Sequence, residues 1–278
     1  MRLRAPAKLN LCLYLGRPRN DGLHELRSLF CPLTLSDRIV VADSEQDEVV
    51  CPDLDGPNIA EAALAGLRAR GWRHQPVRVE IDKRIPVAAG LGGGSADAAA
   101  VLRLARGEVD DLDALAAEIG ADVPSQLAPV FTLVAGAGEV VEPLAAPAHF
   151  GIVLVPDGEG LSTAHVYEEA DRLGLGRDPR ELDEITGELR RVASRGESPL
   201  AYPELLVNDL APAALSLRPR IGDALDALRE AGAEMALVTG SGPTAFGLFE
   251  DIAAADAASA RLGPRFAGAI VSGPDPGR

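Results

Sequence analysis

The stretch PVAAGLGGGSADAAA, residues 86–100, contains four glycines. Each glycine costs about 0.5 to 1 kcal/mol more than alanine in backbone entropy on folding, so the run is unfavourable unless bare backbone is needed there. A strand is expected over 76–82 and a helix over 95–107, with Ser95 as its N-cap. Glycines before a helix N-terminus let a phosphate approach unpaired N–H groups. The stretch predicts a phosphate-binding loop; a flexible linker or a tight packing turn is the alternative.

Two widespread phosphate loops do not fit these glycines. The P-loop requires a lysine directly after its last glycine, and none follows here. Gly90, Gly92 and Ser95 approach the dinucleotide fingerprint of oxidoreductases, with Asp110 twenty residues after Gly90. The sixth position is however serine, and Asp110 lies in a turn before a helix. The pattern therefore disfavours P-loop nucleotidases and dinucleotide-dependent dehydrogenases.

The rest of the chain alternates strand and helix patterns. Over residues 3–16, leucines alternate with other residues from Leu9 to Leu15, which is typical of a half-buried strand. Further strands, helices and a hairpin are expected by the same reasoning over 24–30 and 37–43 (strands), 57–71 and 112–120 (helices), 130–144 (hairpin), 151–156 (strand), 162–174, 179–196 and 219–232 (helices), and 235–250 (strand, glycine turn, strand). The fold class is therefore α+β or mixed α/β, and we expect α+β.

Length and composition predict two domains. The 278 residues are 47% hydrophobic and 25% charged, as in ordinary globular proteins, and the apolar runs are too short to cross a bilayer. The best boundary is the segment PLAAPAHFG, rich in proline and small residues, at 143–151. We expect an N-terminal domain over 1–147 and a C-terminal domain over 148–278.

Charge and cysteine usage narrow the class of protein further. The net charge of -15 argues against nucleic acids or anionic membranes as partners. Residues 1–39 nevertheless hold seven basic and three acidic residues, a local balance of +4 that suits either an anionic ligand or a solvated surface. Cys12, Cys31 and Cys51 form no disulfide framework, and no export signal is visible. We expect a cytoplasmic protein.

Lysine is rare in this chain. Among its 27 lysines and arginines, only Lys8 and Lys83 are lysine. A compact ammonium differs from a guanidinium in geometry and hydration, so lysine is expected where that difference matters. Lys8 shares one side of the first strand with Asn10 and is a candidate for chemistry. Lys83, at the end of a strand, is expected to be solvated.

The motif P-x-x-x-G-L-G-G-G-S-A, residues 86–96, resembles the ATP-binding motif of the GHMP kinases, which are small-molecule kinases unrelated to the P-loop fold. The segments PAKLN, DGLHELRSLF, GADVP and TGSGPTAF are similar to segments of the same family, in the same order over roughly the whole chain. The resemblance implies a two-lobed α+β fold with the active site between the lobes. It also implies transfer of a phosphoryl group from ATP, with Mg2+, to an alcohol.

The resemblance implies a catalytic pair, the lysine of PAKLN and the aspartate of GADVP. In this chain these are Lys8 and Asp122. An aspartate can accept the hydroxyl proton, and a lysine can hold both the aspartate and the γ-phosphate. From the residues alone, a turn carboxylate that caps the next segment is the alternative for Asp122. The ATP contacts that the resemblance implies are Asn58, Pro86, Val87, Ala88, Ala89, Gly90, Leu91, Gly92, Gly93, Gly94, Ser95 and Ala96; no protein ligand for a metal is assigned.

PAKLN and GADVP together are similar to the branch of the family whose acceptor is a cytidine diphosphate-linked methylerythritol, phosphorylated on its 2-hydroxyl in the non-mevalonate route to isoprenoid precursors. That branch implies His24 and Tyr167 at the cytosine, although Leu23 stands where tyrosine is usual. The other acceptor contacts that it implies are Asn10, Thr163, Gly240 and Ser241. The alternatives are a kinase of the family that acts on homoserine, mevalonate or a sugar, and a non-catalytic nucleotide-binding protein of this fold.

Overall fold

The first of two sheets is built around a long antiparallel pair, β1 and β2. The computed structural model describes residues 1–54 and 56–277. In the six-stranded sheet, β2 pairs with β1 along most of its length, with β4 near its C-terminal end and with β5 near its N-terminal end. Only β3 and β4 run parallel. The strands are β1 (Arg2–Pro18), β2 (His24–Asp43), β3 (Glu48–Val50), β4 (Val77–Asp82), β5 (Thr132–Gly136) and β6 (Val140–Pro143).

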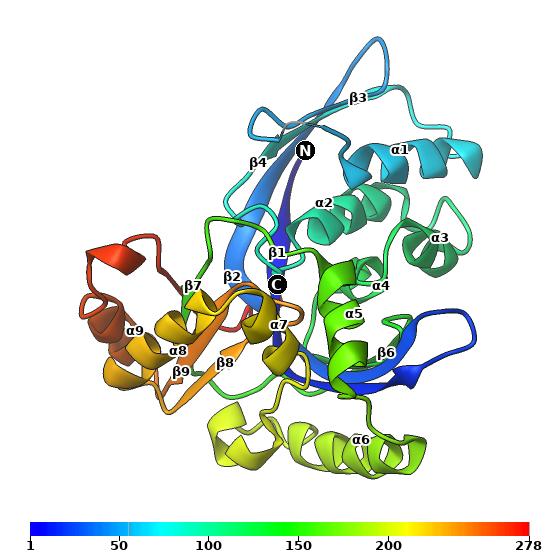
Figure 1. Cartoon of the computed structure of the whole chain (residues 1–278). Helices are drawn as coiled ribbons and strands as arrows, with labels where there is room; N and C mark the ends of the chain where they lie inside the picture. Colours follow the sequence, from blue (N-terminus) through cyan, green and yellow to red (C-terminus); the bar gives the residue numbers. More distant parts are fainter. Residues whose placement is uncertain (55, 278) are drawn as a thin grey trace.

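Four helices lie on one side of the long strands (Figure 1). They are α1 (Ile59–Ala69), α2 (Gly93–Leu102), α3 (Leu112–Ile119) and α4 (Val123–Leu127), and the short η1 (Arg103–Ala105) continues α2. Helix α2 is central because its alanines allow close approach, and every residue from Ala96 to Leu102 is buried. The apolar side chains of α1 and β4 complete this core. The glycine loop that precedes α2 is thereby fixed to a rigid part of the molecule.

The second sheet has four antiparallel strands in the order β10-β7-β9-β8. They are β7 (Gly151–Val155), β8 (Met235–Val238), β9 (Ala245–Phe249) and β10 (Ile270–Ser272). The remaining helices are α5 (Thr163–Leu173), α6 (Pro179–Ala193), α7 (Ala211–Leu217), α8 (Arg220–Glu230) and α9 (Ile252–Ser259), with the short turns η2 (Pro199–Ala201), η3 (Pro203–Leu205) and η4 (Pro264–Phe266). No helix in the described part of the chain is both long and apolar enough to span a membrane.

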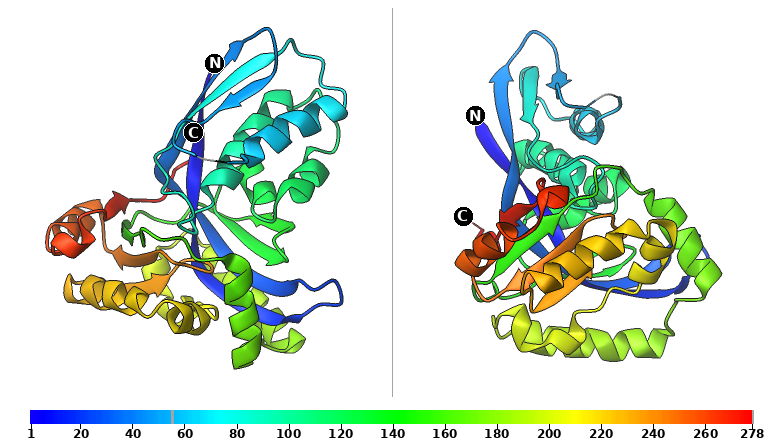
Figure 2. Two further views of the ribbon diagram at one scale, coloured as in Figure 1. Left: turned by 45° about the horizontal axis from the view of Figure 1, so that its top comes forward. Right: turned by 60° about the vertical axis from the view of Figure 1, so that its left-hand side comes forward.

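Strand β1 runs through the middle of the molecule (Figure 2), and it is buried on both faces from Ala5 to Gly16. The expectation of a half-buried strand is therefore wrong. Leu9 and Leu11 belong to the largest core cluster, whereas Leu13 and Leu15 pack against side chains of α5 and α7. Backbone groups of the second half also bond to the edge of β1, so this strand is covered by segments distant in sequence.

Element boundaries differ from the expected ones in two informative places. The segments expected as two strands, 24–30 and 37–43, form the single strand β2. The helix α2 begins at Gly93, with Gly92 at the N-cap in a left-handed conformation and no side-chain cap, so Ser95 is not the cap. The expected fold class, α+β, is confirmed by the two sheets and their helices. The first sheet ends at Pro143 and the second begins at Gly151, and we propose to keep the domain boundary at 147/148 between them.

Candidate active site

The catalytic candidates Lys8 and Asp122 lie side by side although 114 residues separate them. Nζ of Lys8 is 3.2 Å from Oδ2 of Asp122 and donates a hydrogen bond of 2.6 Å to Oδ1 of Asn10. It also lies 4.7 Å from the ring centre of Phe30. The Lys8 side chain is 7% exposed and that of Asp122 is 32% exposed, so the ammonium is largely desolvated while the carboxylate is open to a ligand.

Asp122 does not cap the helix that follows it. It occupies the N-cap position of α4, yet its side chain makes no cap hydrogen bond. The hydroxyl of Ser125 donates instead to the backbone carbonyl of Asp122, at 2.8 Å. The carboxylate of Asp122 therefore contacts Lys8 and not the backbone of α4. This argues against the alternative that Asp122 is a purely structural turn residue.

The glycine loop touches Lys8 directly. The backbone N–H of Lys8 donates to the carbonyl of Leu91 at 2.9 Å. Gly92 has a φ of 68°, and a Cβ there would lie 2.8 Å from Cγ of Lys8. Glycine is therefore required at this position for two reasons, its left-handed backbone and the passage of the lysine stem. The glycine loop and Lys8 are therefore in direct contact.

A second glycine turn, residues 239–243 between β8 and β9, contacts the glycine loop and the strand that carries Lys8. Gly90 has a φ of 75°, and a Cβ there would lie 2.5 Å from the carbonyl oxygen of Gly242. The backbone N–H of Asn10 donates to Oγ1 of Thr239 at 3.0 Å, and a Cβ on Gly240 would lie 3.0 Å from Oδ1 of Asn10. The turn therefore packs against both the loop and the Lys8 pair.

The structure places the other predicted acceptor residues around this turn. Oγ of Ser241 and Oγ1 of Thr163, the first residue of α5, are 3.0 Å apart. Asn10 is only 3% exposed, and its amide nitrogen donates to Oγ of Ser28 at 2.9 Å. The amide of Asn10 thus serves to position Lys8. Thr239 and Ser28 complete this network. Both lie in segments that are similar to the family, TGSGPTAF and DGLHELRSLF, but neither was predicted as a site residue.

Most of the predicted nucleotide residues line one cavity of about 260 Å³ beside the glycine loop. Its lining includes Asn58 and the run from Pro86 to Ser95. Ala96 is fully buried on α2 and does not line the cavity. Oδ1 of Asn58 caps α1 by accepting from the N–H of Ala60 at 2.9 Å, while its amide nitrogen is buried without a partner.

Gly94 offers a clean test of the loop. A Cβ on Gly94 would meet only Ile59, at 3.5 Å, whereas a Cβ on Gly93 would press on Ile85 and Lys83 at 3.1 to 3.2 Å. We expect Gly94→Val to raise the dissociation constant of ATP about tenfold or more, since the branched side chain fills space beside the loop. The free energy of unfolding should change by less than about 1 kcal/mol. Isothermal titration with ATP measures the first effect and urea denaturation the second.

The control for Gly94→Val is Gly187→Val on α6, where a Cβ would meet nothing within 4 Å. This exposed helical glycine lies outside the nucleotide cavity, so the control should leave ATP affinity unchanged. Unaltered ATP affinity in folded Gly94→Val would mean that the loop does not hold phosphate.

Lys83 is not solvated as expected. Its Nζ donates to Oδ2 of Asp37 at 2.5 Å and to Oδ2 of Asp97 at 2.8 Å, and both carboxylates are buried. Oδ1 of Asp37 accepts from the N–H groups of Arg84 and Ile85, while Oδ1 of Asp97 has no partner. Of this Lys83 cluster, Lys83 and Asp97 line the cavity beside the glycine loop, while Asp37 is fully buried.

The Lys83 cluster predicts a pH dependence of stability. Burial, only partly offset by the charge of Lys83, raises the pKa of Asp97 to about 7. A carboxyl whose pKa is higher in the folded than in the unfolded chain stabilises the fold at low pH, and this contribution disappears as pH rises through 7. Relative to Asp97→Asn, the wild type should lose up to about 1.4 kcal/mol of unfolding free energy per pH unit between pH 4 and 7.

Urea denaturation at pH 5, 6 and 7 measures this difference, with Asp82→Asn as the control. The Asp82 side chain is 59% exposed and pairs with Arg84 at the surface. A constant difference between wild type and Asp97→Asn across these pH values would show that Asp97 titrates as an ordinary carboxyl.

The predicted base-binding residues, His24 and Tyr167, also lie together. Their ring centres are 5.1 Å apart, with the planes inclined by 48°. Burial raises the pKa of Tyr167 to about 12, and the charge of Asp122 acts in the same direction. Leu23, which precedes His24, is exposed.

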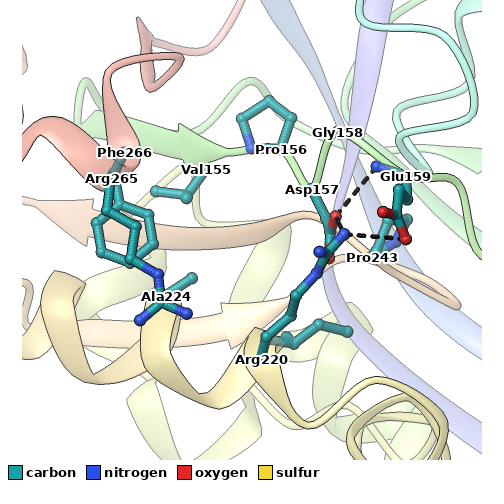
Figure 3. A pocket seen from close by; sticks show the side chains of 11 residues that line it. Val155, Pro156, Asp157, Gly158, Glu159, Arg220, Ala224, Pro243, Arg265 and Phe266 are labelled. Atoms are coloured by element: carbon teal, nitrogen blue, oxygen red, sulfur yellow. Dashed lines mark hydrogen bonds and ion pairs between the residues drawn. The ribbon is translucent and has the colours of Figure 1, made fainter.

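A larger cavity of about 500 Å³ lies in the C-terminal half and is lined by none of the predicted residues (Figure 3). Its charged groups are paired with one another or with near neighbours. Arg220 forms an ion pair with Asp157, and Arg265 is paired with Asp223 at 2.5 Å. None of the residues of the glycine loop and neither Lys8 nor Asp122 lines this cavity.

Three of the six arginines of the segment 1–39 form ion pairs among the described residues. Arg4 pairs with Asp275 at 3.1 Å, Arg19 with Asp21 at 2.7 Å, and Arg27 with a neighbouring glutamate. Of the basic residues in this segment, only Lys8 faces the nucleotide loop. The excess of positive charge in this segment therefore lies mainly outside the site beside the glycine loop.

Two family models match this chain. The model of the GHMP kinases N terminal domain matches residues 58–129, and that of the GHMP kinases C terminal domain matches residues 199–267. Among curated proteins, a 4-diphosphocytidyl-2-C-methyl-D-erythritol kinase of Streptomyces avermitilis is 39% identical, over 94% of this chain and 91% of that protein. One of Rhodococcus jostii is 40% identical, over 99% and 93%.

Solved structures agree with the sequence relatives. A crystal structure of 4-(cytidine 5'-diphospho)-2C-methyl-D-erythritol kinase is 35% identical, with a TM-score of 0.79 and 98% of each chain covered. A homoserine kinase from Cytophaga hutchinsonii has a TM-score of 0.71 at 18% identity, covering 99% of this chain and 94% of that one, which shows the fold alone.

Proposed function

The chain belongs to the 4-diphosphocytidyl-2-C-methyl-D-erythritol kinases of the GHMP family, and from this premise we propose that Lys8 and Asp122 catalyse transfer of the γ-phosphoryl group of ATP to the 2-hydroxyl of 4-diphosphocytidyl-2-C-methyl-D-erythritol. The observation that carries the assignment is the 3.2 Å contact between Lys8 and Asp122 beside the glycine loop. A lysine and a carboxylate in contact at a phosphate loop suit phosphoryl transfer to a hydroxyl.

The reaction divides between the two residues. Asp122 accepts the proton of the acceptor hydroxyl as the new oxygen–phosphorus bond forms and the bond to the β–γ bridging oxygen breaks, which leaves ADP. Lys8 holds the Asp122 carboxylate through their 3.2 Å contact and neutralises charge that develops on the γ-phosphoryl oxygens. The backbone N–H groups at the start of α2 hold the remaining phosphates.

Mg2+ is expected to enter with the nucleotide. The described residues contain no group of three or more His, Cys, Asp or Glu side chains arranged to hold a metal ion. Magnesium in kinases commonly keeps several waters and binds the substrate phosphates with few protein ligands, so an ATP-bound ion fits this site without a protein cage. When bound, it would supply charge neutralisation on the phosphates.

The acceptor's base is assigned to the pair of His24 and Tyr167. The tyrosine ring offers a stacking wall, and the ring of His24 lies beside it. Low identity to the homoserine and mevalonate kinases, 13 to 19%, supports this acceptor over theirs.

An assay of ADP release over a panel of acceptor alcohols tests the proposal. We expect turnover with the cytidine diphosphate-linked methylerythritol, and inhibition by CDP that is competitive with the acceptor rather than with ATP. Tyr167→Ala should weaken acceptor binding about tenfold, because stacking on a base contributes about 1 to 3 kcal/mol, and should leave the KM for ATP unchanged. Turnover of homoserine or mevalonate without inhibition by CDP would overturn the assignment.

We also propose a cytoplasmic location. All three cysteines are free thiols, and Cys12 and Cys31 are fully buried. Burial raises the pKa of the Cys12 thiol to about 12, so it stays protonated and unreactive at neutral pH. A fold that relies on buried free thiols suits a reducing compartment.

A further inference from the structure

We propose that Asp171 on α5 is a positioning residue that fixes the tautomer of His24, and that this tautomer selects a base with an exocyclic amine over one with a carbonyl in the same place. The inference rests on the proposed function and deepens it, because it concerns which pyrimidine the acceptor site prefers.

The contact between the two side chains is well defined. Nε2 of His24 lies 2.8 Å from Oδ1 of Asp171. The His24 side chain is 7% exposed, at the start of β2, and Asp171 is 46% exposed on the last turns of α5. An ionised carboxylate only accepts hydrogen bonds, so Nε2 must carry the proton. The proton of neutral His24 is thereby assigned to one ring nitrogen.

One helix holds the ring of His24 from two directions. Tyr167 precedes Asp171 by four residues, so both side chains project from the same face of α5. Tyr167 packs against the His24 ring with centres 5.1 Å apart, while Asp171 holds its Nε2 edge. Ring rotation would break the bond to Asp171, so the position of Nδ1 is set as well. Within the described part of the chain, Nδ1 of His24 forms no hydrogen bond.

As a chemical consequence, the ring of His24 offers a single free hydrogen-bond acceptor, Nδ1, to a bound base. In neutral His24 with the proton on Nε2, Nδ1 presents a lone pair. This lone pair accepts a hydrogen bond from the exocyclic amine of cytosine, whereas the carbonyl at the same position of uracil would face it lone pair to lone pair. A site built to bond one polar group discriminates against a ligand that lacks it. The His24–Asp171 pair therefore favours cytidine over uridine nucleotides.

The test compares inhibition by CDP and UDP against the acceptor at pH 8. In wild type we expect CDP to bind about tenfold more tightly than UDP. In Asp171→Ala this ratio should fall toward one, with the KM for ATP unchanged. Asp256→Ala on α9 is the control, since Asp256 is exposed and forms no ion pair among the described residues. The control should keep the wild-type ratio.

Nitrogen-15 NMR of the histidine ring supplies a second readout that a merely structural role would not move. Wild type should show a protonated Nε2 and an unprotonated Nδ1, and Asp171→Ala should show exchange between the two tautomers. Equal inhibition by CDP and UDP in wild type, or an unchanged ratio and unchanged ring shifts in Asp171→Ala, would overturn the inference alone. Absence of inhibition by both nucleotides would overturn the proposed function and the inference together.

Discussion

Asp122→Asn is expected to lower kcat by a factor of about 10² to 10⁴ while ATP still binds, because the amide cannot accept the proton of the acceptor hydroxyl. The carboxylate is partly open to ligand, contacts Lys8 at 3.2 Å and makes no cap bond to α4. Its removal therefore leaves the helix start intact. The unfolding free energy should change by less than about 1 kcal/mol. Single-turnover kinetics with saturating ATP separate the chemical step from binding.

The matched control is Asp113→Asn in the first turn of α3. It removes the same charge at an exposed position on the helix that precedes α4. It should keep kcat within about twofold, as surface substitutions generally have small effects. A kcat for Asp122→Asn similar to that of the control would mean that Asp122 has only a structural role and that another group accepts the proton.

Much of the candidate site could be predicted because its parts carry local signals. The period-2 pattern of the first strand placed Lys8 and Asn10 on one side, and the structure confirms that they touch. The glycine run before a helix predicted a loop of unusual backbone, and Gly90 and Gly92 are indeed left-handed. The contact of Lys8 with Asp122 carries no such signal, because nothing in GADVP distinguishes a reacting carboxylate from a capping one. Only the resemblance to the GHMP kinases predicted that Lys8 and Asp122 form a pair.

The missed features depend on contacts between distant segments. Lys83 looks like a solvated residue at a strand end, and its burial depends on Asp37, 46 residues before it, and Asp97, 14 residues after it. Strand β1 looks half-buried from its period, yet backbone groups of residues 207 and 209 bond to Leu13 from the second half of the chain. Side-chain periodicity indicates that one face of a strand is covered, whereas both faces of β1 are covered.

The second large effect is expected for Lys8→Arg, which keeps the charge but should lower kcat/KM by about 10² or more. The ammonium lies within 2.6 Å of Asn10 Oδ1 and 3.2 Å of Asp122 Oδ2, and its stem crosses Gly92 where even a Cβ would clash. A planar guanidinium is larger and bonds through a fork, so it does not fit this buried space without displacing the loop. Losing one positioned hydrogen-bond donor at a reacting group typically costs about 10² to 10³ in rate, and a displaced guanidinium should cost a similar amount.

Lys8→Met separates charge from shape, because methionine has a similar unbranched stem and no charge. Lys8→Met should lose at least as much activity as Lys8→Arg, with a cost of about 1 to 3 kcal/mol in unfolding free energy, because Oδ1 of Asn10 loses its 2.6 Å bond and keeps only the longer one from Thr239. Arg229→Lys, an exchange of the same two side-chain types at an exposed position on α8, is the control and should leave kcat/KM unchanged. Full activity of folded Lys8→Arg would show that the site needs only a positive charge, and that the compact geometry of lysine beside Gly92 has no part in the reaction.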